Sequence, residues 1–170
     1  MDNPYKPPAS AVRDPPPAPR APRSPVVAVL AGTAIDLGGS LLSGIVIGIV
    51  YVAMLAAGGK GTTEIQTTLT QPDPTSAYFI VSAVTGYCFS MLGGYVCARL
   101  VRRRERRVTG VMAAISGIVG FALGGIGAQF GSSDLIFFTL IQVACVMLGG
   151  ELGRRRNAAQ ARAAGVATAA

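Results

Sequence analysis

The chain has 170 residues, of which 51% are apolar, with 22 glycines, 11 prolines, three cysteines and neither histidine nor tryptophan. Its mean hydropathy of +0.49 is far above that of a soluble domain, although its formal net charge is +7. Three cysteines are too few for a disulfide framework in a chain of this length. The lack of histidine excludes most zinc sites and all Ser-His or Cys-His triads. The composition therefore predicts a membrane protein.

Residues 1–25 differ in composition from the rest of the chain. They hold nine of the eleven prolines, together with alanine and four basic residues. Proline fixes φ and lacks an amide donor, so this segment cannot build helices or sheet ladders. We predict a disordered cytoplasmic tail. Recognition of the tail by a polyproline-binding domain is the alternative.

Four apolar stretches follow, and each is as long as the ~20 helical residues that cross a hydrocarbon core of ~30 Å. Backbone amides in lipid must be bonded internally, and the polar-apolar alternation of barrel strands is absent. The sequence therefore predicts an all-α fold, a four-helix transmembrane bundle, within residues 26–153. The first apolar run is too long for a signal peptide, so we expect it to stay as an uncleaved span. The expected spans are 37–57, 77–98, 109–130 and 135–152.

The basic residues predict how the spans are threaded. Four lie in the N-terminal tail, six lie between the second and third spans, and four lie in the basic, alanine-rich tail 154–170. Lys60 is the only basic residue in the loops 58–76 and 131–134. Because basic residues near span ends stay in the cytoplasm, both termini and the arginine loop are expected there. The expected location is the inner membrane of a bacterium.

The arginine loop also has the character of a phosphate-binding surface. Its position directly between two spans is explained by topology, so no nucleic-acid partner is expected. Anionic lipid head groups are the expected partners, besides the bilayer itself. The arginines assigned to them are Arg102, Arg103, Arg104, Arg106 and Arg107.

Small residues recur every four positions in each span, and residues four apart share one face of a helix. Such faces allow the close backbone approach that favours helix association in lipid. The series are Gly32, Asp36, Ser40, Gly44 and Gly48; Ser82, Gly86, Ser90, Gly94 and Ala98; Ser116, Gly120, Gly124 and Ala128; and Cys145, Gly149 and Gly153.

Two short repeats suggest that the spans form two tandem helical hairpins. Residues 43–46 (SGIV) recur at 116–119, and residues 91–94 (MLGG) recur at 147–150. Each hairpin would run in, out and in again, so their symmetry axis would lie along the membrane normal. Accidental matches between glycine-rich segments are the alternative.

Few ionisable side chains lie in or near the spans, and four of them are expected at the cytoplasmic edge. These are Asp36, Arg99, Glu151 and Arg154. A charge at this depth needs a partner, so we expect Asp36 to pair with Arg99 or Arg154. The pair would lock helices together or, as the alternative, form a substrate or proton site. Deeper in the bilayer, Gln142 is expected to make an interhelical polar contact.

The sequence shows no catalytic, cofactor-binding or metal-binding set. The three cysteines lack metal-ligand spacing and are expected to be small packing residues. No acid lies mid-bilayer to carry a proton, and no acid, base and nucleophile converge. We therefore expect a protein that is not an enzyme and has no cofactor. The threonine-rich outer loop is expected to hold at most a short amphipathic turn.

The segments GTAIDLGGSLLSG, MLGGYVCARLVRRRERRVTGVMAA and MLGGELGRRR resemble those of uncharacterised small bacterial inner-membrane proteins with four spans. The resemblance covers residues 31–155 and implies the architecture without an activity. We expect a non-enzymatic multi-pass membrane protein that acts through helix packing, with itself as a homo-oligomer or with other membrane proteins. The alternative is a small channel or transporter subunit with its pathway between the repeated hairpins.

Overall fold

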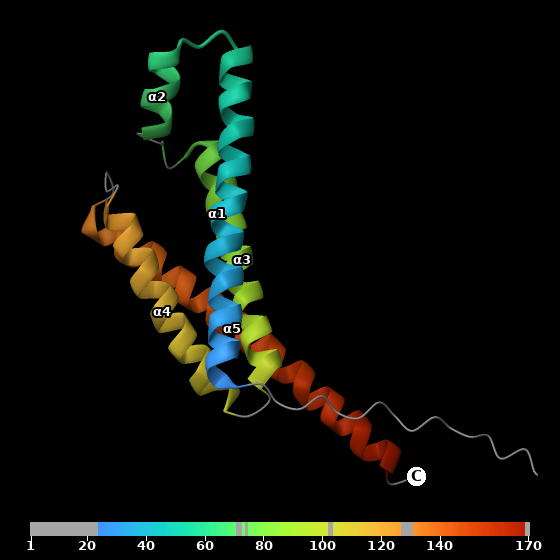
Figure 1. The fold of residues 1–170 in the computed structure, drawn as a ribbon. Helices are drawn as coiled ribbons and strands as arrows, with labels where there is room; N and C mark the ends of the chain where they lie inside the picture. The colour runs from blue at the N-terminus through green and yellow to red at the C-terminus, as the bar shows by residue number, and fades with distance from the viewer. Residues whose placement is uncertain (1–23, 71–72, 74, 102–103, 127–130, 169–170) are drawn as a thin grey trace, which may run out of the picture.

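The computed structural model describes residues 24–70, 73, 75–101, 104–126 and 131–168. These residues form five α-helices and no strand, which confirms the all-α prediction (Figure 1). The disordered tail was predicted over residues 1–25. Residues 1–23 lie outside the described part, and Pro25 is the first residue of a helix. The helices are α1 (Pro25–Ala57), α2 (Thr62–Thr70), α3 (Ala77–Val101), α4 (Glu105–Ile126) and α5 (Ser132–Thr168).

Four of these helices are long and apolar enough to cross a bilayer. Within the described residues, the candidate spans are Pro25–Ala57, Ala77–Val101, Glu105–Leu123 and Ser133–Ala163. Their number, length and composition are those of a multi-pass membrane protein. All four overlap the spans expected from the sequence, although α1 and α5 are longer helices than those spans.

Local chemistry explains where α1 begins and ends. Pro25 occupies the first turn, where its missing amide hydrogen costs no helical bond. At the other end, Gly59 has a φ of +81°, a left-handed conformation that glycine adopts without steric cost. The helix stops at this turn, and the chain continues into the loop that contains α2.

The loop between α1 and α3 contains the short polar helix α2, where the sequence predicted a turn. Lys60 pairs with Glu64 at 2.8 Å, and this hydrogen bond and the opposite charge raise the pKa of Lys60. Beyond α2, the backbone amide and the hydroxyl of Thr75 both donate to Asp73 and lower its pKa. These groups are exposed, so water screens the attraction and its contribution to stability is small.

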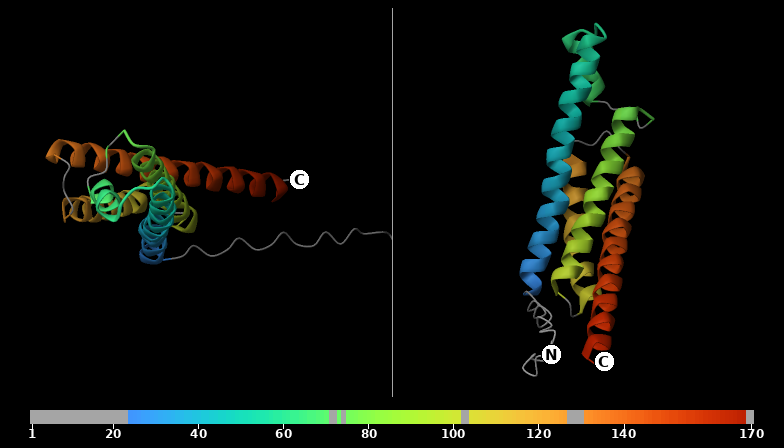
Figure 2. Two further views of the ribbon diagram at one scale, coloured as in Figure 1. Left: turned by 90° about the horizontal axis from the view of Figure 1, so that it is seen from above. Right: turned by 90° about the vertical axis from the view of Figure 1, so that its right-hand side faces the viewer.

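The long helices form two antiparallel hairpins, α1 with α3 and α4 with α5. Helix α3 is central, because its contacts with α1 and with α5 are the most extensive between helices, and it also packs against α4. The start of α1, the end of α3, the start of α4 and the C-terminal part of α5 lie at the same end of the molecule (Figures 1 and 2). We call this end the basic end. Its arginines are Arg99, Arg104, Arg106, Arg107, Arg154, Arg155 and Arg156.

The MLGG repeat lies where the hairpins meet, and each copy uses both of its glycines. In α3, Gly93 lies against the backbone of Gly32 in α1, while Gly94 lies against the Val146 carbonyl in α5. In α5, Gly149 lies against the Met91 carbonyl in α3, while Gly150 lies against Thr109 in α4. In each copy, therefore, one glycine contacts the other helix of the same hairpin, and the second glycine contacts a helix of the opposite hairpin.

The tightly packed core is confined to the half of the bundle near the basic end. Toward the opposite end, the α4–α5 hairpin leans away from α1 and α3 (Figure 1). The apolar residues buried in the core are Ala28, Cys97, Ala98, Val101, Met112, Ala113 and Val146. Few residues pack against the half of α1 farther from the basic end. None of the most apolar part of α1 is buried within the molecule.

Helix α5 continues beyond the expected end of the fourth span at residue 152. It runs without a break through the expected tail to Thr168. Residues 154–165 are mostly alanine, arginine, asparagine and glutamine, most of which have a good helical propensity. The stretch contains no proline, and the helix continues through Gly165.

The contact between α3 and α5 generates a stability prediction. A Cβ at Gly94 would meet the Val146 backbone, which cannot move aside as a flexible side chain can. We expect Gly94→Ala to force the two helices apart and to lower the stability by about 1–3 kcal/mol. The measurement is thermal unfolding of the purified protein in detergent.

Gly110→Ala is the matched control, because a Cβ at Gly110 in α4 meets nothing within 4 Å. This variant should unfold at or slightly above the wild-type temperature, since alanine favours a helix over glycine. Equal unfolding temperatures for the two variants would contradict the packing described here.

Candidate functional site

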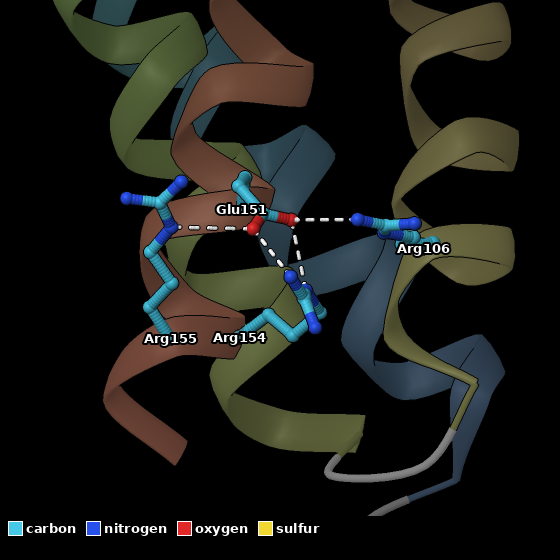
Figure 3. A network of polar contacts seen from close by, with 4 residues as sticks. All are labelled: Arg106, Glu151, Arg154 and Arg155. Atoms are coloured by element: carbon cyan, nitrogen blue, oxygen red, sulfur yellow. Dashed lines mark hydrogen bonds and ion pairs between the residues drawn. The ribbon is translucent and has the colours of Figure 1, made fainter. Parts of the chain in front are cut away.

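The candidate site is a network of polar side chains at the basic end, centred on Glu151 of α5 (Figure 3). Arg154 donates through Nε to Oε2 of Glu151 at 2.8 Å and through Nη2 to Oε1. Arg155 donates through Nε to Oε1 at 3.3 Å, and Arg106 of α4 lies 3.6 Å from Oε2. The positions one turn apart on α5 bring Arg154 and Arg155 to Glu151. Two members of the expected edge cluster, Glu151 and Arg154, are thus brought together.

A second set of hydrogen bonds ties three helices together at Asn157. The Nδ2 of Asn157 donates to the Ala98 carbonyl at 3.0 Å and to Oε1 of Glu105 at 2.8 Å. Its Oδ1 accepts from Nη1 of Arg99 at 3.3 Å, and the same nitrogen donates to Gln160 at 2.8 Å. The carboxamide therefore links α3, α4 and α5.

Sequence reasoning missed Asn157 and Gln160, because it placed both in a tail. Their spacing from Gly153 is four and seven residues, the periodicity of one helix face. If the helix is continued past residue 152, Asn157 and Gln160 share one face with Gly153 and with the small-residue series of the fourth span. A similar bond joins Nη1 of Arg156 to the Tyr95 hydroxyl at 3.2 Å.

Asp36 lies elsewhere, inside the bundle. Its side chain is 1% exposed, and Oδ1 accepts a hydrogen bond of 2.6 Å from the hydroxyl of Ser90 in α3. Oδ2 has no partner among the described residues. The predicted ion pair of Asp36 with Arg99 or Arg154 was therefore wrong.

The reason is depth along the helices. Gly32, one turn before Asp36, already packs against Gly93 and Cys97, so Asp36 faces the part of α3 nearer its middle. Arg99 lies beyond Cys97 and reaches α5. Asp36 therefore lies deeper in the bundle, and further from the arginines, than its expected place at the edge of the first span.

Other hydroxyl oxygens are also buried inside the bundle. The oxygens of Thr33, Ser82, Thr109 and Ser116 are buried and have no hydrogen-bond partner within the described structure. Unpaired buried oxygens destabilise a fold, although small hydroxyls also let membrane helices approach closely. Within the described residues, no group of three or more Cys, Asp and Glu side chains could hold a metal ion.

Gln142 was expected to contact another helix, and its carboxamide does lie against α4. A Cβ at Gly120 would be 2.5 Å from its Oε1. The absence of a side chain at Gly120 therefore makes room for Gln142 between α4 and α5.

Of the arginines assigned to lipid head groups, Arg104, Arg106 and Arg107 lie at the start of α4, while Arg102 and Arg103 are outside the described residues.

Comparisons of this chain with protein-family models, with curated proteins and with solved structures found no match. The site is therefore interpreted from its own geometry. It holds three guanidiniums around one carboxylate at the ends of apolar helices, which is an arrangement for electrostatic binding and helix fixation.

The position of Asp36 generates a prediction about coupling between residues. Ser90→Ala removes the one described partner of a buried carboxylate, so we expect a loss of about 1–3 kcal/mol. Asp36→Asn and Ser90→Ala should be non-additive, because the residues touch. Asp36→Asn and Arg99→Gln should be additive. Thermal or denaturant unfolding in detergent measures all the variants.

Ser43→Ala is the control for loss of a hydroxyl, because Ser43 bonds only to the Ser40 carbonyl of its own helix. It should change stability by less than Ser90→Ala. A coupling between Asp36 and Arg99 larger than that between Asp36 and Ser90 would contradict the contacts described.

Proposed function

We propose that this chain is a non-enzymatic multi-pass protein of a bacterial inner membrane that acts through helix packing, with a second copy or with other membrane proteins. In this proposal the basic end faces the cytoplasm. Support for that orientation comes from the gathering of the arginines at one end, since basic residues near spans remain on the cytoplasmic side.

The observation that carries the proposal is an open position, Gly44, on the small-residue face of α1. Gly32 and Asp36 pack within the molecule, whereas a Cβ at Gly44 would meet nothing within 4 Å. Beside it, Leu41 is 67% exposed. Lipid chains are as apolar as these side chains, so association is driven by close backbone approach at small residues. Gly44 is available for such an approach from another helix.

Self-association is tested with Gly44→Leu in the full-length protein. The leucine should block close approach of a second helix and weaken dimerisation by about tenfold or more. It should leave the monomer folded, because the site is open. Chemical cross-linking in vesicles and sedimentation in detergent at several protein-to-detergent ratios measure the dimer fraction.

Gly38→Leu is the matched control. It adds the same side chain to α1 where a Cβ also meets nothing within 4 Å, about 120° around the helix from Gly44. This variant should dimerise like the wild type. If both variants and the wild type are monomeric and cross-link to no other protein in native membranes, the proposal fails.

A channel or transporter is the second candidate function, and the buried carboxylate favours it. Asp36 keeps one oxygen without a described partner, close to where α4 packs onto the first hairpin. Intramembrane ionisable groups of this kind often mark an ion pathway.

The two functions differ in permeability. On the leading proposal, vesicles containing the protein should release protons, potassium and chloride no faster than empty vesicles. Flux assays with ion-sensitive dyes measure this. A selective flux that Asp36→Asn or Gln142→Ala abolishes would replace the leading proposal with the transport function.

A further inference from the structure

Two adjoining hollows open at the basic end between α4 and α5. The first has a volume of about 490 Å³ and the second of about 310 Å³. Arg106 lines both hollows. The first is lined by Arg106, Thr109, Met147, Gly150, Glu151 and Arg155. The second is lined by Arg104, Glu105, Arg106, Arg107 and Arg154.

The charges around the first hollow are unbalanced. Arg154 bonds to both oxygens of Glu151 and matches its charge. Arg106 and Arg155 lie on either side of this pair (Figure 3). Their side chains are 72% and 74% exposed, and each keeps guanidinium N–H groups that Glu151 does not use. Two positive charges therefore remain to be matched from outside.

The second hollow has the same imbalance. Four arginines line it and Glu105 is its one acid. One oxygen of Glu105 already accepts a hydrogen bond from Asn157. A phosphate group would meet both hollows well, because guanidinium forks bind phosphate oxygens in pairs.

The first hollow also has apolar walls on the side nearer the middle of the spans. Met147 is 40% exposed there. Gly150 has no side chain to fill the space, and the methyl group of Thr109 packs against it. Cationic groups toward the end of the bundle and apolar groups toward its middle match a phosphate that carries hydrocarbon chains. A free phosphate would gain nothing from the apolar part.

We propose that the paired hollows between α4 and α5 bind the phosphate of an anionic phospholipid, with Arg106 and Arg155 as its donors. The acyl chains then follow the apolar surfaces of α4 and α5 toward the middle of the membrane. Glu151 positions the site, because it holds Arg154 and orients Arg155 without neutralising all three arginines. This inference rests on the membrane placement made under the proposed function.

The experiment uses the full chain purified in a zwitterionic detergent. Phosphatidylglycerol, phosphatidylcholine or inorganic phosphate is added, and binding is measured by native mass spectrometry and by the shift in unfolding temperature. We expect the wild type to bind phosphatidylglycerol at least about tenfold more tightly than phosphatidylcholine. Arg106→Gln and Arg155→Gln should each lose most of that preference.

Arg162→Gln is the matched control, because it removes one charge from an exposed position of α5 outside both hollows. It should keep the preference. An equal loss in Arg162→Gln would overturn the inference in favour of diffuse attraction. No preference in the wild type would overturn it outright. Protection by inorganic phosphate as strong as that by phosphatidylglycerol would also overturn it, in favour of a free phosphate ligand.

Unfolding temperatures without added lipid show whether the arginine variants fold. Extraction of native membranes separates this inference from the proposed function. A protein that needs detergent for release but shows no lipid preference contradicts only the inference. A protein released by salt or alkali alone contradicts the membrane placement itself.

Discussion

The architecture depends on the close approach of backbones along α3. At Gly93 and Gly94, this helix touches α1 on one side and α5 on the other, and its Met91 carbonyl lies against Gly149. In lipid these contacts bring little hydrophobic gain, so dispersion between well-fitted surfaces must hold the helices. Any side chain larger than hydrogen would separate them. The glycines therefore determine which helices can be neighbours, and α3 is central because both of its sides are smooth.

Once α3 is fixed between α1 and α5, the polar groups sort by depth. Asp36 and Ser90 meet inside the bundle, whereas Glu151, Arg154 and Arg155 meet at its end. The two groups use different chemistry. The carboxylate of Asp36 is buried and accepts one hydrogen bond of 2.6 Å, while the carboxylate of Glu151 is surrounded by guanidiniums, of which those of Arg106 and Arg155 are exposed. The buried polar contact thus lies inside the bundle, and the ion pairs lie at its end.

The sequence predicts the all-α fold and the four long helices well, because apolar length is a strong signal. It also places Glu151 and Arg154 in one polar cluster, although it pairs Arg154 with Asp36 and not with Glu151. It does not predict the partner of Asp36, because that depends on how far α1 slides along α3. Nor does it predict the role of Asn157, because its spacing has meaning only if α5 continues. Register between helices and the length of a helix in water are set by tertiary contacts that a single sequence does not display.

The length of α5 has a mechanical consequence. Its 37 residues extend about 55 Å, well beyond a hydrocarbon core of ~30 Å. Because Asn157 and Arg156 clamp this rod to α3 just past Gly153, the remaining turns stand as a stiff lever rather than a loose end. A force applied to the tip of that lever is delivered to the seam between the two hairpins.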